Sequence, residues 1–313
     1  MLRIIIAFLF VGMFAQAQTF SKAELKILNK KQDSLSILAW RISNEISATN
    51  RLLSDSVFTK VLVRSLAIKN SFKFAFDSVQ IAKVVAPDSS FRLFTWEVER
   101  SKDKIRQRGV VQYKTPDGKL KIVPLIDNSE FMEELTAVND NRNWIGALYY
   151  KILLNEWQGK KYYTLIGFDE NNSTSNKKWI EVLTFNDAQQ PIFGGPYIQH
   201  TTRGIINRIG LEYKKDSKIK VSYDEEQNMI IYDHLSSETG FVNQRDTYVA
   251  DGDYEGLKWE NGVWKHTEKV MCNCPLSTKE NKEKVNDILI DKDGNKLEQK
   301  LLDKSKKNTG GGN

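Results

Sequence analysis

The chain has 313 residues, of which 40% are hydrophobic and 11% aromatic, and its formal net charge at pH 7 is +6. This composition is typical of a folded globular protein and excludes a largely disordered or collagen-like chain. The basic excess is small, and the lysines and arginines are interspersed with acids rather than gathered in runs. The sequence therefore argues against nucleic acid as a partner.

The first residues, MLRIIIAFLFVGMFAQAQ, have the parts of a secretory signal peptide, predicted for residues 1–17. One positive charge at Arg3 precedes an apolar run, and small residues then fit signal peptidase, with cleavage between Ala17 and Gln18. The apolar run is shorter than the roughly 20 residues of a transmembrane helix, so no transmembrane segment is expected in the mature chain. The sequence predicts export to the periplasm or the exterior, and no lipoprotein, because no cysteine lies near the cleavage site.

A helical hairpin is predicted for residues 18–75. Ser21 and Glu24 are spaced as a capping box, and apolar residues recur at helical spacing from Leu25 onward. A second helical pattern covers about residues 56–69. The apolar stripe is too short for a clean coiled coil, so the pair is expected to pack on its own protein.

Residues 80–270 are predicted to form an antiparallel β-domain, because from Phe91 onward the hydrophobic period changes to two. The turns between strands are short, whereas parallel pairs need crossovers of a dozen residues or more. A meander arranged as a sandwich or barrel is therefore expected, and the fold class is α+β, mainly β. The apolar segments ALYYKILLNEW, KYYTLIGF and KKWIEVLTF suit the middle of a sheet.

Three local features complete the predicted fold. Thr115-Pro116-Asp117-Gly118 is a turn sequence between two strands. Asp127 and Glu130 are spaced as a capping box and predict a short helix. Residues 275–313 are charged and poor in aromatic side chains, so a polar, disordered tail is expected there.

The segment YVADGDYEGLKWENGVWKH, residues 248–266, contains the strongest hairpin signal of the chain. A two-residue turn at Asn261-Gly262 would place Trp259 opposite Trp264, and His266 would share their face. If that face is buried, the three residues belong to the core, which is the favoured interpretation. If it is exposed, they are candidates for a ligand platform that stacks on sugars.

Asp251, Asp253 and Glu255 alternate just before this hairpin and would share one face of a continuous strand. Three carboxylates on one face can hold Ca²⁺. Glycines within and beside the triplet argue against a continuous strand, and Asp-Gly first indicates a turn. No metal site is therefore favoured, and no cofactor is expected. The same interpretation applies to a second polar loop, at Asp169, Asn171 and Ser173.

The chain lacks the nucleophile elbow, zinc-protease, P-loop and dinucleotide motifs. With only three histidines, a catalytic triad has few centres, and Asp233-His234 is interpreted as a strand end. The paired carboxylates of a glycosidase are recognised by their separation in space. A secreted hydrolase that uses paired Asp or Glu therefore remains the alternative to a non-catalytic role.

Cys272 and Cys274 are the only cysteines and are separated by one residue. A disulfide between them requires a bend, because extended chain places their Cα atoms at the upper limit for a bridge. In an oxidising compartment such a bridge is a candidate. Intermolecular pairing, free thiols and a zinc site with His266 are the alternatives.

Several ordered motifs, FRLFTWEV, KYYTLIGFDENN, KKWIEVLTF, PIFGGP, YDHL and DGDYEGLKWENGVW, resemble those of a family of uncharacterised exported proteins from Bacteroidota. The resemblance covers about residues 91–265. It implies an envelope or secreted location and no particular reaction. The sequence thus favours an exported, non-catalytic binding or structural protein, with a protein or glycan of the cell envelope as its partner.

Overall fold

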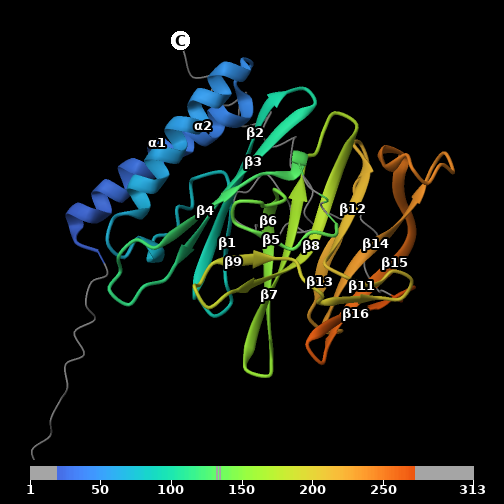
Figure 1. Ribbon diagram of the computed structural model, residues 1–313. Helices are drawn as coiled ribbons and strands as arrows, with labels where there is room; N and C mark the ends of the chain where they lie inside the picture. The colour runs from blue at the N-terminus through green and yellow to red at the C-terminus, as the bar shows by residue number, and fades with distance from the viewer. Residues whose placement is uncertain (1–19, 132, 134, 272–313) are drawn as a thin grey trace, which may run out of the picture.

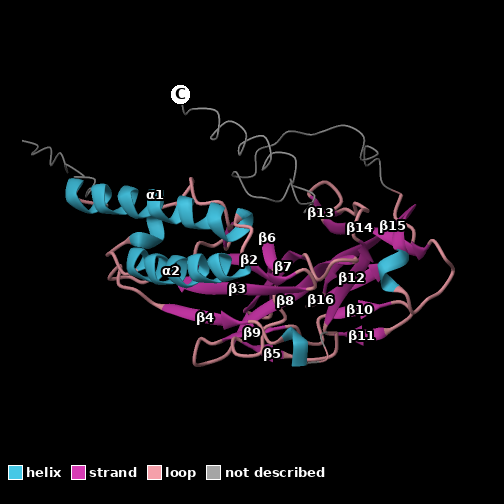
Figure 2. Cartoon of the chain, turned by 90° about the horizontal axis from the view of Figure 1, so that it is seen from above, coloured by secondary structure: helices cyan, strands magenta, loops and turns pink. Residues whose placement is uncertain are grey.

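The computed structural model describes residues 20–131, 133 and 135–271. Within this part, the chain forms four layers, a pair of helices followed by three sheets (Figures 1 and 2). Strand accounts for 44% of the structure and helix for 20%, so the predicted mainly β fold with two N-terminal helices on antiparallel sheets is confirmed. The predictions outside the described residues are the signal peptide with its cleavage at Ala17 and Gln18, the pair Cys272 and Cys274, and the tail over 275–313.

The helical layer consists of α1 (Lys22–Asn44) and α2 (Ala48–Leu66). The capping box of α1 is formed as predicted, with the Glu24 N–H donating to Ser21 Oγ at 3.2 Å and the Ser21 N–H donating to Glu24 Oε2 at 2.8 Å. Helix α2 begins two turns earlier than predicted. Arg51, in its first turn, donates to the carbonyl oxygens of Glu45 and Ile46 and so satisfies the backbone after α1. Neither helix is long and apolar enough to cross a membrane, and no other helix in the described part is.

The first sheet lies under the helices and is antiparallel. Its strands, in spatial order, are β1 (Ala82–Val85), β2 (Phe91–Ser101), β3 (Lys104–Tyr113) and β4 (Ile122–Ile126). A 3₁₀ turn, η1 (Ser71–Lys73), precedes them. The predicted turn between β3 and β4 is formed, because the Gly118 N–H donates to the Thr115 carbonyl at 3.2 Å.

The prediction of a short helix after Asp127 was wrong. Among the residues that the structure describes there, a single 3₁₀ turn, η2 (Ser129–Phe131), follows. Asp127 uses one carboxylate oxygen to accept the N–H of Ser129 and the other to accept the N–H of Gln107 on β3, at 2.8 Å. Its side chain therefore binds a turn and a neighbouring strand instead of capping a helix. Phe131, at the end of this turn, is 81% exposed.

The central sheet contains the three apolar segments. KYYTLIGF and KKWIEVLTF form interior strands as predicted, but ALYYKILLNEW forms an edge strand, because it pairs on one side only. Its strands, in spatial order, are β5 (Asn139–Asp140), β9 (Pro191–Phe193), β8 (Ser175–Phe185), β7 (Lys160–Asp169) and β6 (Leu148–Trp157), with β12 (Arg208–Lys214) also paired to β8. Arg208 and Glu181 form a fully buried ion pair at 3.0 Å across the β12–β8 pair. The remaining Arg208 donors reach the carbonyl oxygens of Ala137 and Phe193.

The third sheet carries the C-terminal strands. In spatial order they are β11 (Gly204–Ile206), β10 (Ile198–His200), β16 (Val263–Thr267), β15 (Tyr248–Glu260), β14 (Met229–Ser237) and β13 (Val221–Asp224), with the 3₁₀ turn η3 (Arg245–Thr247) before β15. β10 and β16 pair in parallel, with Ile198 beside Trp264. This parallel pair departs from the predicted antiparallel meander. The connection from β10 to β16 contains four other strands of the same sheet.

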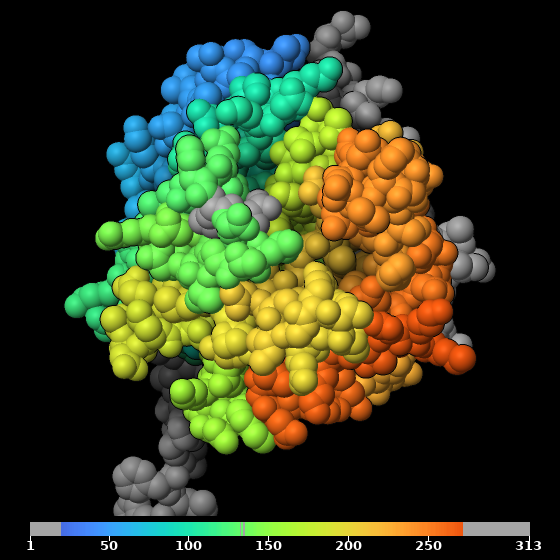
Figure 3. All heavy atoms as spheres, turned by 45° about the vertical axis from the view of Figure 1, so that its right-hand side comes forward, coloured from blue at the N-terminus to red at the C-terminus, as the bar shows by residue number. Residues whose placement is uncertain are grey.

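Three hydrophobic cores fill the spaces between the four layers. The core between the helices and the first sheet includes Leu28, Leu35, Phe58, Leu62, Phe94 and Trp96. The core between the first and central sheets includes Leu93, Val111, Trp144, Tyr149, Leu165 and Trp179. The core between the central and C-terminal sheets includes Ile166, Ile180, Ile209, Ile230, Leu257 and Trp264. The sheets are thus stacked face to face. On the surface, a hollow lies where the green, yellow and orange segments meet (Figure 3).

Candidate functional site

The hairpin predicted at residues 248–266 has the expected register. Trp259 lies opposite Trp264, with ring centroids 5.4 Å apart in an edge-on arrangement. Both turn residues, Asn261 and Gly262, have positive φ, as a two-residue turn of this type requires. Trp264 is 1% exposed and its indole N–H donates to Thr164 Oγ1 of the central sheet at 2.8 Å. The tryptophan pair therefore belongs to the core rather than to an open platform.

The prediction that glycines interrupt the strand before this hairpin was wrong. β15 runs without a break over 13 residues, and Gly256 pairs regularly with Ile231. Gly252, at φ 98°, lies where the register with β14 shifts. The glycine thus forms a bulge instead of ending the strand. As a result, Asp251 and Glu255 stay within one strand, close to histidines from the neighbouring strands.

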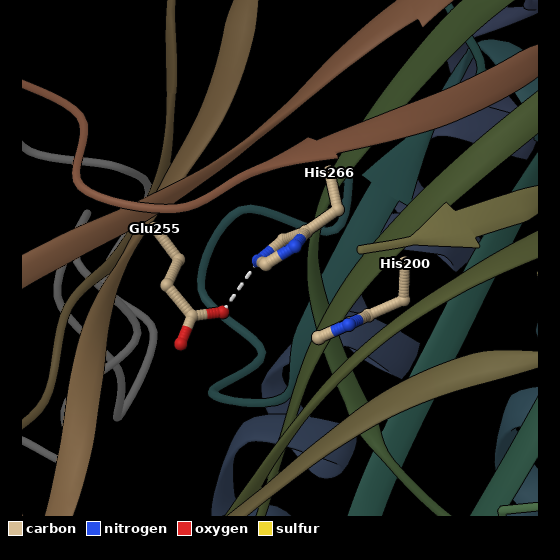
Figure 4. Close-up of side chains that lie close together, drawn as sticks. All are labelled: His200, Glu255 and His266. Carbon is tan, nitrogen blue, oxygen red and sulfur yellow. Dashed lines mark hydrogen bonds and ion pairs between the residues drawn. The ribbon is translucent and has the colours of Figure 1, made fainter. Parts of the chain in front are cut away.

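All three histidines of the chain, His200, His234 and His266, meet around Glu255. β10 supplies His200, β16 supplies His266 and β15 supplies Glu255 (Figure 4). One ligand atom from each of these three residues lies within 4.8 Å of the others. The parallel pairing of β10 with β16 brings the two imidazole rings together, and their centroids stack 3.8 Å apart.

Glu255 is the centre of the contacts. Its Oε2 lies 2.6 Å from His266 Nε2 and accepts the Tyr232 hydroxyl at 2.8 Å. Its other oxygen, Oε1, lies 3.7 Å from His234 Nε2. The carboxylate therefore has a histidine nitrogen beside each of its two oxygens.

A second layer of polar groups orients His266. Thr201 Oγ1 lies 2.9 Å from His266 Nδ1, and the same hydroxyl donates to Glu268 Oε1 at 2.7 Å. The backbone N–H of Thr201 also lies 3.5 Å from His266 Nδ1. On the opposite side of the ring, Nε2 lies within hydrogen-bond distance of Glu255, so an N–H at Nε2 donates to the carboxylate. His200, by contrast, has only 3.3 Å contacts to Thr202, so no strong partner sets its tautomer.

Burial lowers the pKa of His200 to about 4, and the positive charge of Arg203 acts in the same direction. His200 is therefore neutral at pH 7, which is the form that binds a metal. Burial opposes ionisation of Glu255, but hydrogen bonds from His266 and Tyr232 outweigh it and lower the pKa of Glu255. Burial and the Glu255 charge raise the pKa of Tyr232 well above its usual value, so Tyr232 stays a neutral donor.

The cluster is closed on one side and open on the other. The His266 side chain is fully buried and that of Glu255 is 18% exposed. The His234 side chain is 44% exposed. Solvent and small solutes therefore reach the cluster from the His234 side.

The other predicted polar residues do not join the cluster. The Asp253 side chain is 62% exposed, and its nearest ion-pair partner, Lys269, is 4.0 Å away. In the second polar loop, Asp169 accepts hydrogen bonds from Gln107 and from the Asn171 N–H, both at 2.9 Å. Ser173 donates to Asp103. Each of these loop side chains thus has partners within the protein.

Sequence reasoning named Glu255 as a candidate metal ligand and His266 as a core or ligand-platform residue, but it favoured no metal site and did not connect them with His200, His234 or Tyr232. The alternation that puts Glu255 on the tryptophan face and His266 beside Trp264 was visible in the sequence. The neighbourhood of His200 depends on a parallel strand pair separated by more than 60 residues in the chain. Only the scarcity of histidine, three in 313 residues, was a signal for it.

Two imidazoles and a carboxylate form a donor set that suits a divalent transition-metal ion, zinc above all. Imidazole is a ligand for Zn²⁺, Cu²⁺ and Ni²⁺, whereas Ca²⁺ and Mg²⁺ prefer oxygen alone. Comparison of the chain with protein-family models, curated proteins and solved structures finds no match. The chemistry of the site is therefore argued from its own residues.

Proposed function

We propose that this chain is an exported, non-catalytic protein that binds a divalent transition-metal ion, with Zn²⁺ as the test ion. The observation that carries the proposal is the approach of His200, Glu255 and His266 to within 4.8 Å. In a tetrahedral zinc site the bonds to the ion are roughly 2.0–2.1 Å long, so the ligand atoms lie about 3.3 Å from one another.

The electrostatics of the cluster support a bound cation. His266 Nε2 and Glu255 Oε2 lie 2.6 Å apart, which is a hydrogen-bond distance, so a proton lies between them. Zn²⁺ can replace that proton, and the Thr201 and Glu268 contacts then act as the outer hydrogen bonds that orient a metal-bound histidine.

The histidine contacts of the acidic residues support the non-catalytic part of the proposal. Asp251 and Glu255 are each engaged by a histidine, at 2.6 Å in both cases. A paired-carboxylate hydrolase instead needs two carboxyl groups that flank a substrate. No observation in the described residues favours that alternative, and it stays a prediction, as does the envelope protein or glycan partner.

Titration calorimetry with Zn²⁺ tests the metal site. The wild-type chain is expected to bind one Zn²⁺ per molecule, and Glu255→Gln to weaken binding at least tenfold. Asp253→Asn is the matched control, since it lies two residues away on the same strand and is exposed. An absence of zinc binding by the wild type, or an equal loss in both variants, would contradict the proposal.

The export part of the proposal is supported by the N-terminal sequence and by the family resemblance of residues 91–265. Cell fractionation of the full chain, followed by mass measurement of the product, tests it. Recovery outside the cytoplasm with a chain beginning at Gln18 is expected. A cytoplasmic chain that retains residues 1–17 would contradict export without affecting the metal site.

A further inference from the structure

His234 lies at the open side of the cluster, and its tautomer is determined by one contact. His234 Nδ1 is 2.6 Å from Asp251 Oδ2. An ionised carboxylate only accepts hydrogen bonds, so His234 Nδ1 is the donor. In the neutral ring, the lone pair is then on Nε2, which faces Glu255 Oε1 at 3.7 Å.

The strand geometry accounts for this orientation. The pairing of β14 with β15 shifts between Asp233 and Leu235, and His234 is the residue at the shift. Bulges of this kind change the direction of a side chain. On the other strand, the bulge contains Asp251 and Gly252, so one irregularity positions both the histidine and the carboxylate that orients it.

Glu255 thus has a histidine nitrogen on each side, His266 Nε2 at 2.6 Å from Oε2 and His234 Nε2 at 3.7 Å from Oε1. A hydrogen bond donated by the far N–H of an imidazole to a carboxylate is the arrangement commonly found behind metal-bound histidines. The Asp251 and His234 pair has this arrangement.

We propose that His234 is the fourth ligand of the metal ion and that Asp251 is its positioning residue. This inference rests on the proposed metal-binding function. With His200, His266 and Glu255, it completes a set of three nitrogens and one oxygen. Four protein ligands are typical of closed zinc sites, whereas catalytic sites keep a position for water. The His234 side chain is 44% exposed, and its Nε2 lies 3.7 Å from Glu255 Oε1, on the open side of the cluster.

Cobalt(II) is the probe for this inference, because its visible spectrum distinguishes four protein ligands from a site that includes water. The wild-type Co²⁺ complex is expected to give a tetrahedral spectrum. His234→Ala should weaken Zn²⁺ binding more than tenfold and change the Co²⁺ spectrum, and added imidazole should restore both. Asp251→Asn should weaken binding about 10- to 100-fold, the usual effect of losing such an outer partner. Asp253→Asn is the control and should change neither quantity.

The two proposals fail in different ways. If the wild-type chain binds neither Zn²⁺ nor Co²⁺, the metal-binding function itself is wrong. If the wild type binds but His234→Ala has the same affinity and spectrum, only the role of His234 is wrong. Because His234 is partly exposed, its replacement should leave the fold intact, and circular dichroism of the variant checks this.

Discussion

Two glycines in equivalent turns provide a matched test of the packing at one end of the sheets. Gly159, after Gln158 between β6 and β7, has φ of 74°, and Gly262, after Asn261 between β15 and β16, has φ of 85°. An added Cβ at Gly159 would meet no atom within 4 Å. An added Cβ at Gly262 would lie 2.5 Å from Trp157 Cδ1, a distance at which the indole must move.

The two alanine variants should therefore differ in stability. Gly159→Ala has only the left-handed backbone to accommodate, which costs about 1 kcal/mol. Gly262→Ala has the same backbone cost and must also displace Trp157, and overpacking of this kind costs roughly 1–3 kcal/mol. Trp157 is 37% exposed and its ring has room to turn, so the lower half of that range applies. We expect about 2–3 kcal/mol for Gly262→Ala.

Urea unfolding measures both costs, provided that the slope of free energy with urea stays the same in each variant. The Trp157→Ala background supplies the control, because without the indole Gly262→Ala should cost no more than Gly159→Ala. Equal costs for the two glycine variants in the wild-type background would refute the reasoning. An excess cost at Gly262 that persists without the indole would refute it as well.

Glu181→Gln should destabilise the fold by about 3–5 kcal/mol in urea unfolding, because it leaves the fully buried Arg208 without its counter-charge; a cost below 1 kcal/mol would contradict this. Asp88→Asn should cost about 2 kcal/mol at pH 7, because Asp88 accepts charge-assisted hydrogen bonds from Ser90 Oγ at 2.7 Å and from Lys161 at 2.8 Å. Partial burial opposes ionisation of Asp88, but these hydrogen bonds outweigh it and hold its pKa well below the usual value. The stabilisation is therefore complete above the unfolded pKa of about 3.9 and is lost as the pH falls below it, so the wild-type and Asp88→Asn unfolding curves should approach each other toward pH 2. Asp253→Asn should change the free energy of unfolding by less than about 0.5 kcal/mol, since the side chain is exposed; a larger change would show that it has a structural partner.

Local sequence determined the features that depend on neighbouring residues. The capping box at Ser21 and Glu24 sets the start of α1, and Asn261-Gly262 sets the register that pairs Trp259 with Trp264. The continuous apolar pattern of KYYTLIGF and KKWIEVLTF predicted interior strands correctly, because these strands are buried on both faces, whereas ALYYKILLNEW lies at the edge of the sheet. Each of these signals acts over a few residues, so no knowledge of the remaining chain was needed.

The tertiary structure alone decided which distant strands meet. His200 approaches His266 because β10 pairs in parallel with β16, and His234 approaches Asp251 because the register shifts at a bulge. Neither event has a local sequence signal, since strand order is set by how the sheets stack and cover their apolar faces. Gly252 and Gly256 illustrate the limit, because the same residue type forms a bulge at one position and pairs regularly at the other. The sequence thus determined most of the elements, whereas the strand order and register of the third sheet brought Glu255 and the three histidines together.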